Sequence, residues 1–267
     1  MRRAFRLMKN MIKKMIKGLM RAALSPFIIP DWLRFAKASG IARSKARGFA
    51  VSPLDAYPQI KDKTATTGFD RHYVYHTSWA ARIVSELRPA KHVDISSSLY
   101  FSGIVSAFVP VDFYDYRPAE LGLSDLSSKR GDLLALPFED DSVASISCMH
   151  TIEHVGLGRY GDPMDPDGDI KAVNELKRVT AVGGSLIFVT PIGEKARIEF
   201  NAHRIYAYEQ IMNMFDGFDL AEFALIPERA EKGGLIRHAD AALIAGERYA
   251  CGCFHFTKKD SSAKLNA

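Results

Sequence analysis

The amino-acid sequence predicts an α/β fold: a mostly parallel sheet with helices on both faces, preceded by a basic amphipathic helix. Two observations carry this prediction. From residue 69 onward, short apolar segments alternate with helical segments of about 8–16 residues, which is the pattern of a wound parallel sheet. The first thirty residues, by contrast, contain eight basic side chains and no acidic one.

The composition is that of a soluble globular protein. Of 267 residues, 47% are hydrophobic and 25% are charged, which suits one large or two small domains. The three cysteines, Cys148, Cys251 and Cys253, are too few for a disulfide framework and lack the paired spacing of a zinc site. We therefore expect a reducing, cytoplasmic environment and no metal site.

The net charge of +5 is unevenly distributed along the chain. Residues 31–267 carry 28 of the 36 basic residues against all 31 acidic ones, so the body is slightly acidic. The body also has no stripe of basic and aromatic residues, which argues against nucleic acid as a partner. Any attraction to anions belongs to the first thirty residues.

We divide the chain into a basic amphipathic helix (1–30), a linker or cap segment (31–68), the main domain (69–260) and a tail (261–267). At the helical repeat of about 100° per residue, the methionines and isoleucines of the first segment fall on one side and most of its cations opposite. Such a helix lies well at an anionic bilayer surface. We therefore expect a peripheral membrane contact through residues 1–24.

Two other interpretations of the first segment stay open: an organelle transit peptide, or a helix whose methionine-rich face packs on the rest of the protein. A membrane-spanning helix is excluded because lysines interrupt the roughly 18 consecutive apolar residues that it needs. A secretory signal peptide is excluded because Ser25 and Pro26 break the longest apolar stretch.

The main domain is predicted to be Rossmann-like. Helices are expected at residues 70–89, 101–108, 169–184 and 206–218, and strands at residues 91–96, 109–116, 143–150, 184–191, 219–227 and 248–259. The glycine pair Gly183 and Gly184 is expected to stop the third helix. In such sheets ligands bind beyond the carboxyl ends of the strands. Those ends are residues 94–98, 112–115, 131–133, 150–154 and 190–193.

Taken in order, these strand ends resemble a class I S-adenosylmethionine-dependent methyltransferase over roughly residues 70 to 260. The matching segments are "VDISSS", "VDFYD", "GDLLALPFEDDSVASISCMHTIEHV" and "NELKRVTAVGGSLIFVTP". More narrowly, "DISSSLYFSG" together with "GDPMDPDGD" resembles a small methyltransferase-like family of undefined function, domain of unknown function 268.

The resemblance implies S-adenosylmethionine as cofactor. Asp112 or Asp115 would accept hydrogen bonds from both ribose hydroxyls, because a carboxylate offers two acceptor oxygens. Asp132 would take the adenine amino group, with Leu133 packed on the ring. The alternative for these acids is a structural one, as caps of turns or helices. The first turn would contribute Asp94, Ser96 and Ser98, which complete the predicted set of cofactor-binding residues.

The first turn departs from the family pattern, because serines stand where glycines are usual. Glycine there permits a positive φ and a close approach of the backbone to the ligand. A serine hydroxyl can nevertheless bond the amino-acid carboxylate of the cofactor. The turn is therefore compatible with the cofactor without being evidence for it.

The predicted catalytic residues follow the fourth predicted strand end, where His150, Glu153 and His154 lie, and His203 lies near the same rim. Methyl transfer to a hydroxyl needs alignment and a general base. The segment also fits the H-x-x-E-H pattern of inverted zinc proteases, but it leaves a strand and soon meets glycines, which argues against the required helix. A capping or core role for each histidine stays open.

A cluster of acids occupies "GDPMDPDGD". A calcium loop would need glycine at position 170, where the chain has Ile170. We expect these acids to be solvated and Asp169 to cap the helix that follows.

Three functions remain. The first is a methyltransferase acting on a glycan or other small hydroxyl acceptor near the inner membrane face. The second is a methyltransferase-like binding module without catalysis, and the third is a transferase that uses a sugar nucleotide in the same crevice. The sequence does not indicate the oligomeric state.

Overall fold

The computed structural model describes residues 26–52, 55 and 57–260. The chain divides into two compact units, one up to Gly68 and one from Phe69 onward. In the first unit, residues 26–37 are helical and helix α2 spans Gly40–Ala46. The predicted N-terminal helix, up to residue 25, and the tail at 261–267 lie outside the described residues. No helix within the described ranges is long and apolar enough to cross a bilayer.

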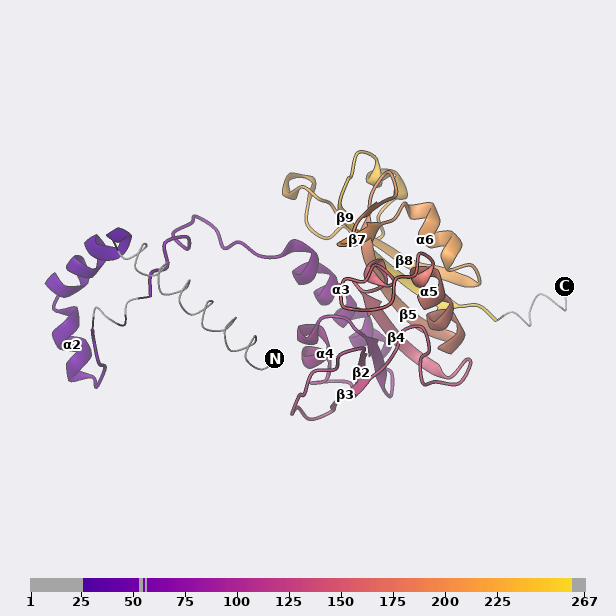
Figure 1. The fold of residues 1–267 in the computed structure, drawn as a ribbon, viewed down its shortest axis with the longest axis horizontal. Coiled ribbons are helices and arrows are strands. Elements are labelled where there is room, and N and C mark those ends of the chain that lie inside the picture. The colour runs from indigo at the N-terminus through magenta and orange to yellow at the C-terminus, as the bar shows by residue number, and fades with distance from the viewer. Residues whose placement is uncertain (1–25, 53–54, 56, 261–267) are drawn as a thin grey trace, which may run out of the picture. The chain divides into compact units, whose positions relative to one another are not determined.

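The second unit is built on a seven-stranded sheet of order β3-β2-β1-β4-β5-β9-β8 (Figure 1). Strand β9 runs antiparallel to both of its neighbours, and the other neighbouring pairs are parallel. The predicted mostly parallel, Rossmann-like sheet is therefore confirmed. The strands are β1 (His92–Ile95), β2 (Val111–Asp115), β3 (Leu126–Arg130), β4 (Val143–Met149), β5 (Thr180–Ile192), β8 (Phe218–Ile226) and β9 (Ala250–Lys258).

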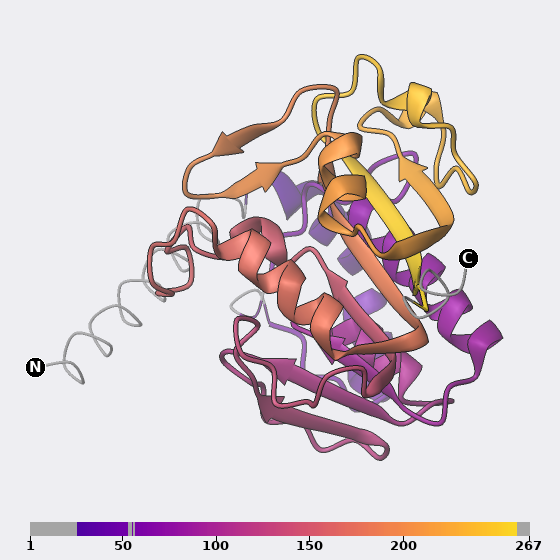
Figure 2. The same cartoon turned by 90° about the vertical axis from the view of Figure 1, so that its right-hand side faces the viewer.

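Helices cover both faces of the sheet, as predicted (Figure 2). Side chains of α3 (Arg71–Leu87) and α4 (Leu99–Val105) pack in one apolar cluster, and those of α5 (Gly168–Val179) and α6 (Tyr208–Met214) in another. Strand residues alternate between the two: Ile187 joins the first cluster and Phe188 the second. Full burial of side chains of this size contributes about 1.5–3 kcal/mol each.

Three elements differ from the prediction. Strand β3 was not predicted, because its sequence "LSSKR" has only one apolar residue. In the structure it pairs with β2 at the edge of the sheet. The predicted glycine stop of α5 is wrong: the helix ends at Val179 and β5 begins with Thr180, which pairs with Val143. A short hairpin, β6 (Arg197–Glu199) and β7 (His203–Ile205), is an addition.

The rim at the carboxyl ends of β1, β2, β4 and β5 gathers the predicted ligand-binding segments. Beyond β4 the chain makes a single 3-10 turn, η2 (Ile152–His154), and then a loop that leads to α5. Two further 3-10 turns, η3 (Ala230–Lys232) and η4 (Ala241–Ile244), lie between β8 and β9. Since β9 runs antiparallel, its first residues lie beside the end of β5 and so at this same rim.

Candidate functional site

The serine turn after β1 is held by the neighbouring strands. Ser96 takes a left-handed backbone conformation, with φ of 54°, and its N–H donates to the Tyr114 carbonyl over 2.8 Å. The Ser97 hydroxyl accepts from the Met149 N–H at 3.0 Å, and Ser98 is the N-cap residue of α4. The turn therefore keeps the positive φ that glycine would favour and offsets its cost with hydrogen bonds.

Asp94 does not reach the rim, although it was predicted to bind the cofactor. Its side chain is fully buried and accepts hydrogen bonds from Ser102 and, at 2.6 Å, from Ser147. Burial raises the pKa of this carboxyl to about 6, despite those hydrogen bonds. Asp94 thus ties β1 to α4 and β4. Ser98, as a helix cap, likewise lines no part of the crevice described below.

The two acids of β2 have different surroundings. Asp112 accepts from Ser127 and forms ion pairs with Lys91 and Lys129, both at 3.1 Å, away from the strand end. Asp115 is the last residue of the strand and lines the crevice. One of its oxygens accepts from the Arg117 N–H at 2.6 Å, and the other has no hydrogen-bond partner among the described residues. Of the two candidates, the structure brings Asp115 to the crevice and Asp112 elsewhere.

The crevice at this rim has a volume of 330 Å³. It contains Ser96, Asp115, Asp132 and Leu133 from the predicted cofactor set. Asp132 Oδ1 accepts from the Leu134 N–H at 2.9 Å, its second oxygen has no hydrogen-bond partner among the described residues, and the neighbouring Leu133 lines the same crevice. A cavity of this size, with an apolar wall and a few polar groups, is typical of a small-molecule site.

His150 and Glu153 form a buried pair. His150 Nδ1 lies 2.9 Å from Glu153 Oε1, and Glu153 is 1% exposed. Because a carboxylate only accepts, the imidazole donates through Nδ1 and keeps a lone pair on Nε2. Glu153 Oε2 has no hydrogen-bond partner among the described residues. His150 also has a positive φ of 53° at the end of β4, where local strain often accompanies function.

His154 and His203 lie close to that pair: His154 Nε2 is 3.8 Å from Glu153 Oε1, and the centroids of the two imidazoles are 6.3 Å apart. His154 Nδ1 is 2.7 Å from the Ala202 carbonyl, a contact in which Nδ1–H donates and Nε2 is left to accept a proton. Burial lowers the pKa of His154, although the nearby Glu153 opposes this shift, so the imidazole is neutral at pH 7. His203 Nε2 lies 3.3 Å from a Glu199 carboxylate oxygen, an ion-pair distance.

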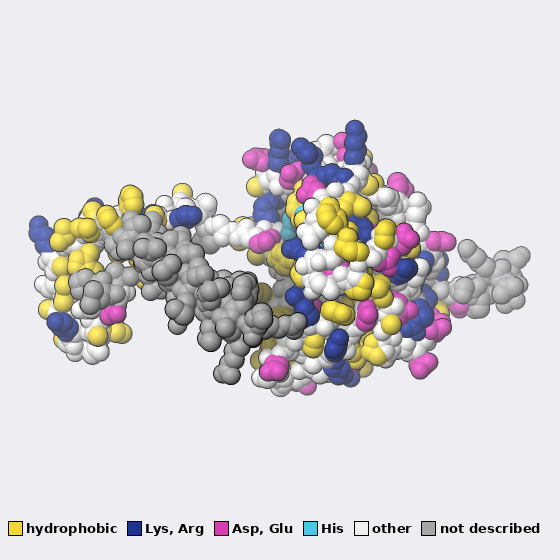
Figure 3. Space-filling model, viewed as in Figure 1, with side chains coloured by type: hydrophobic (Ala, Val, Ile, Leu, Met, Phe, Trp, Pro, Cys, Tyr) yellow, Lys and Arg dark blue, Asp and Glu magenta, His cyan; other side chains and the backbone are white. Residues whose placement is uncertain are grey.

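A second cavity, of 560 Å³, adjoins the first. His150, His154 and Tyr160 line both cavities, so these three side chains form the boundary between them. Glu153 and His203 line the second cavity alone. The four predicted catalytic residues therefore converge on one cavity next to the crevice. Figure 3 shows histidine surface among apolar and charged side chains on the visible face of this unit.

Sequence reasoning missed several residues of this second cavity. His72 and Tyr73 reach it from α3, and Tyr249 from the segment before β9. His72 and His76 are spaced one helical turn apart, which is a signal for residues on one helix face. Tyr249 has no comparable local signal, because only the antiparallel insertion of β9 brings it to the rim.

The loop between η2 and α5 is anchored from β7. Arg204 is 5% exposed and donates to the carbonyls of Val155, at 2.7 Å, and Pro166, at 3.0 Å. Its guanidinium lies 3.5 Å from Asp169, which also accepts from the Tyr206 hydroxyl at 2.8 Å. The prediction that Asp169 is a solvated helix cap is wrong, since it is buried inside α5 and paired.

The inverted zinc-protease arrangement is absent from this part of the chain. His150 precedes η2, and η2 is one 3-10 turn, so His150 and His154 do not share a regular helix face. The donor atoms that lie together at this rim are instead those of His72, His150 and Cys251.

Comparisons with known proteins agree with this architecture. Residues 136–232 match the family described as "Caenorhabditis protein of unknown function, DUF268". No curated protein matches the chain. The fold is similar to the crystal structure of a candidate sarcosine dimethylglycine methyltransferase from Galdieria sulphuraria, with a TM-score of 0.50 and 15% identity over 70% of this chain and 86% of that one.

The fold is also similar to the N-methyltransferase NodS from Bradyrhizobium japonicum WM9, solved with S-adenosyl-L-homocysteine. The TM-score is 0.49 and the identity 13%, over 70% of this chain and 87% of that one. The resemblance stated from the sequence is thus confirmed: residues 136–232 match domain of unknown function 268, and they lie in a unit with the class I methyltransferase fold.

Proposed function

We propose that the protein is an S-adenosylmethionine-dependent methyltransferase that binds the cofactor in the 330 Å³ crevice and the methyl acceptor in the adjoining cavity. The observation that carries this proposal is the shared boundary of His150, His154 and Tyr160. A transfer reaction needs donor and acceptor in contact within reach of a base, and two cavities with a common histidine wall meet that need.

The crevice residues fit the cofactor. The second carboxylate oxygen of Asp115 suits a ribose diol, and the second oxygen of Asp132 suits an adenine amino group. Leu133 supplies an apolar surface next to Asp132 for a flat ring. The Ser96 hydroxyl, on the same wall, donates to the Tyr114 carbonyl at 3.2 Å and would have to turn away from it to donate to an amino-acid carboxylate.

The cofactor supplies a methyl group already activated on a sulfonium centre. The chain then has to align the acceptor and remove its proton. His154 Nε2 is the base, because the neutral imidazole has its Nδ1–H engaged by Ala202. Glu153 lies 3.8 Å from Nε2 and stabilises the imidazolium that forms. Burial of both groups keeps bulk water from competing for the proton.

The acceptor we propose is a hydroxyl compound such as a glycan, held near an anionic membrane surface. The second cavity supports a hydroxyl acceptor, since its histidines, tyrosines and Glu153 are hydrogen-bonding groups. The basic residues 1–24 support the membrane contact, as do the exposed apolar side chains of the adjoining helical segment, Phe27 and Leu33. Liposome flotation tests this: equal recovery with and without residues 1–24 would exclude the contact.

Isothermal titration calorimetry with S-adenosylhomocysteine tests cofactor binding. The wild type is expected to bind one molecule per chain, and Asp132→Ala and Asp115→Ala to weaken binding by about 10-fold or more, since 1.4 kcal/mol corresponds to tenfold. Asp112→Asn is the matched control on β2 and leaves the affinity unchanged, because Asp112 pairs with lysines outside the crevice. His154→Ala also retains binding.

The proposal is wrong if the wild type shows no binding heat at millimolar ligand. It is equally contradicted if a nucleoside diphosphate sugar binds in the crevice with the dependence on Asp115 and Asp132 expected for the cofactor.

A further inference from the structure

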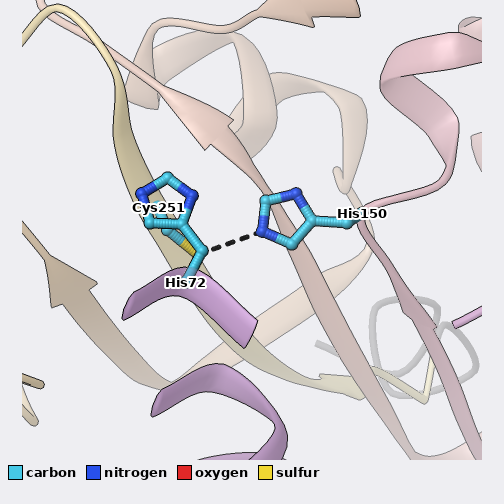
Figure 4. A group of neighbouring side chains, drawn as sticks. All are labelled: His72, His150 and Cys251. Atoms are coloured by element: carbon cyan, nitrogen blue, oxygen red, sulfur yellow. Dashed lines mark hydrogen bonds between the residues drawn. The ribbon is translucent and has the colours of Figure 1, made fainter. Parts of the chain in front are cut away.

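We propose that His72, His150 and Cys251 form a binding site for a transition-metal ion, with Zn²⁺ the best match to two imidazoles and a thiolate. The three side chains come from α3, the end of β4 and the start of β9 (Figure 4). One donor atom from each lies within 4.8 Å of the others. Tetrahedral zinc, with bonds of about 2.0–2.3 Å, requires the set to close by on the order of 1 Å.

His150 is already oriented as a metal ligand. Its Nδ1–H donates to Glu153 Oε1, so the lone pair of Nε2 faces the Cys251 sulfur at 3.4 Å, the contact marked in Figure 4. A carboxylate behind a ligating histidine is the usual support of zinc sites, because it fixes the ring and increases its basicity. Glu153, buried and with one oxygen unpartnered among the described residues, fits that supporting position.

His72 is held in place by ring stacking. Its imidazole stacks on His150, with centroids 5.6 Å apart and an interplanar angle of 12°, and on Tyr249 at 5.2 Å. The two stacking contacts fix the ring with one of its nitrogen atoms within 4.8 Å of the donor atoms of His150 and Cys251. The contact between the Cys251 thiol and the His150 imidazole does not need a third side chain. The presence of His72 beside it therefore favours a site with three ligands.

An ion can reach this site from a cavity, and its fourth coordination position is open. His72 and His150 line the 560 Å³ cavity, while Cys251 is fully buried beneath them. Three protein ligands with a fourth position open to a cavity is the arrangement of catalytic zinc rather than structural zinc. When the ion binds, Cys251 loses its S–H proton to solvent and coordinates as a thiolate. A role of the ion in holding a methyl acceptor rests on the proposed function, whereas ion binding does not.

The test is titration of the full-length, chelator-treated protein with Co²⁺, followed by displacement with Zn²⁺. We expect one ion per chain and a thiolate-to-cobalt charge-transfer absorption that Zn²⁺ removes. Cys251→Ser abolishes that absorption. Glu153→Gln, which removes only the charge that supports His150, is expected to weaken Co²⁺ binding by roughly 10- to 100-fold. His72→Gln, which removes a ligand, is expected to weaken it by more than that.

Cys148→Ser is the matched control, because Cys148 is also buried but packs in the cluster on the opposite face of the sheet. The Cys148→Ser variant is expected to keep the charge-transfer absorption and the affinity for Co²⁺.

The proposal is overturned if the wild type shows no charge-transfer absorption. It is also overturned if Cys251→Ser keeps the absorption and Cys253→Ser removes it, since the Cys253 sulfur lies 3.9 Å from that of Cys251. His72 is only partly buried, so His72→Gln tests the site even if a cysteine variant fails to fold. S-adenosylhomocysteine binding, measured separately, reports on the proposed function.

Discussion

At the scale of single residues, polar groups near the rim divide into those that hold the strands and those that face the cavities. Asp94, Ser97 and Asp112 have their hydrogen-bonding groups engaged within the protein, whereas Asp115 and Asp132 each have one oxygen without a partner among the described residues. The sequence places all five at strand ends. It cannot separate them, because the division depends on which side chain meets a serine or lysine of a neighbouring strand.

The buried Asp94 carboxyl predicts a pH dependence of stability. Its pKa in the folded state, about 6, lies above the ordinary value of 3.8, so folding favours the neutral acid. The stability that Asp94 contributes is present below pH 4 and is lost as the pH rises through 6. We expect the free energy of unfolding of the wild type, relative to Asp94→Asn, to fall by about 3 kcal/mol over that window. Urea unfolding at several pH values measures this, and a constant difference would contradict it.

At the scale of elements, the strands buried on both faces were the ones that their sequences predicted. Most residues of β4 and β5 are buried, and β5 has an unbroken apolar run at residues 186–189, because α3 and α5 lie on opposite sides of them. Strand β3 escaped prediction because it lies at the sheet edge and is largely polar. The missed residues of the second cavity have the same kind of cause: contacts such as that of Cys251 with His150 arise from the sheet order, not from local spacing.

The loop from η2 to α5 depends on one buried arginine. Arg204→Met removes two hydrogen bonds to the loop and leaves Asp169 buried without its cation, so we expect unfolding free energy to fall by about 3–5 kcal/mol. Arg197→Met on the same hairpin breaks a more exposed pair with Glu199 and is expected to cost about 1 kcal/mol or less. Chemical unfolding compares the two variants, and hydrogen exchange of residues 155–166 is faster in the first. Equal losses would show that Arg204 is not the anchor.

At the scale of the whole molecule, the apolar clusters of the sheet belong to the second unit. Among the described residues, their buried members run from Trp79 to Phe256, all within the second unit. The visible surface of the second unit intersperses basic and acidic side chains (Figure 3). That the body does not bind nucleic acid stays a prediction from the sequence.

A fragment of residues 69–260 is therefore expected to fold alone. Because both clusters stay intact, its thermal unfolding should be cooperative, with a midpoint within a few degrees of that of the full chain. Differential scanning calorimetry of the two proteins makes the comparison. A fragment without a cooperative transition would show that residues 1–68 complete the core.

The central claim is that cofactor and acceptor occupy adjoining cavities with His150 and His154 between them. A crystal structure of the protein with S-adenosylhomocysteine tests it most directly. We predict the ribose at Asp115, the adenine between Asp132 and Leu133, and the sulfur directed at the boundary histidines. Ligand density outside the crevice, or a sulfur directed away from His154, would contradict the account.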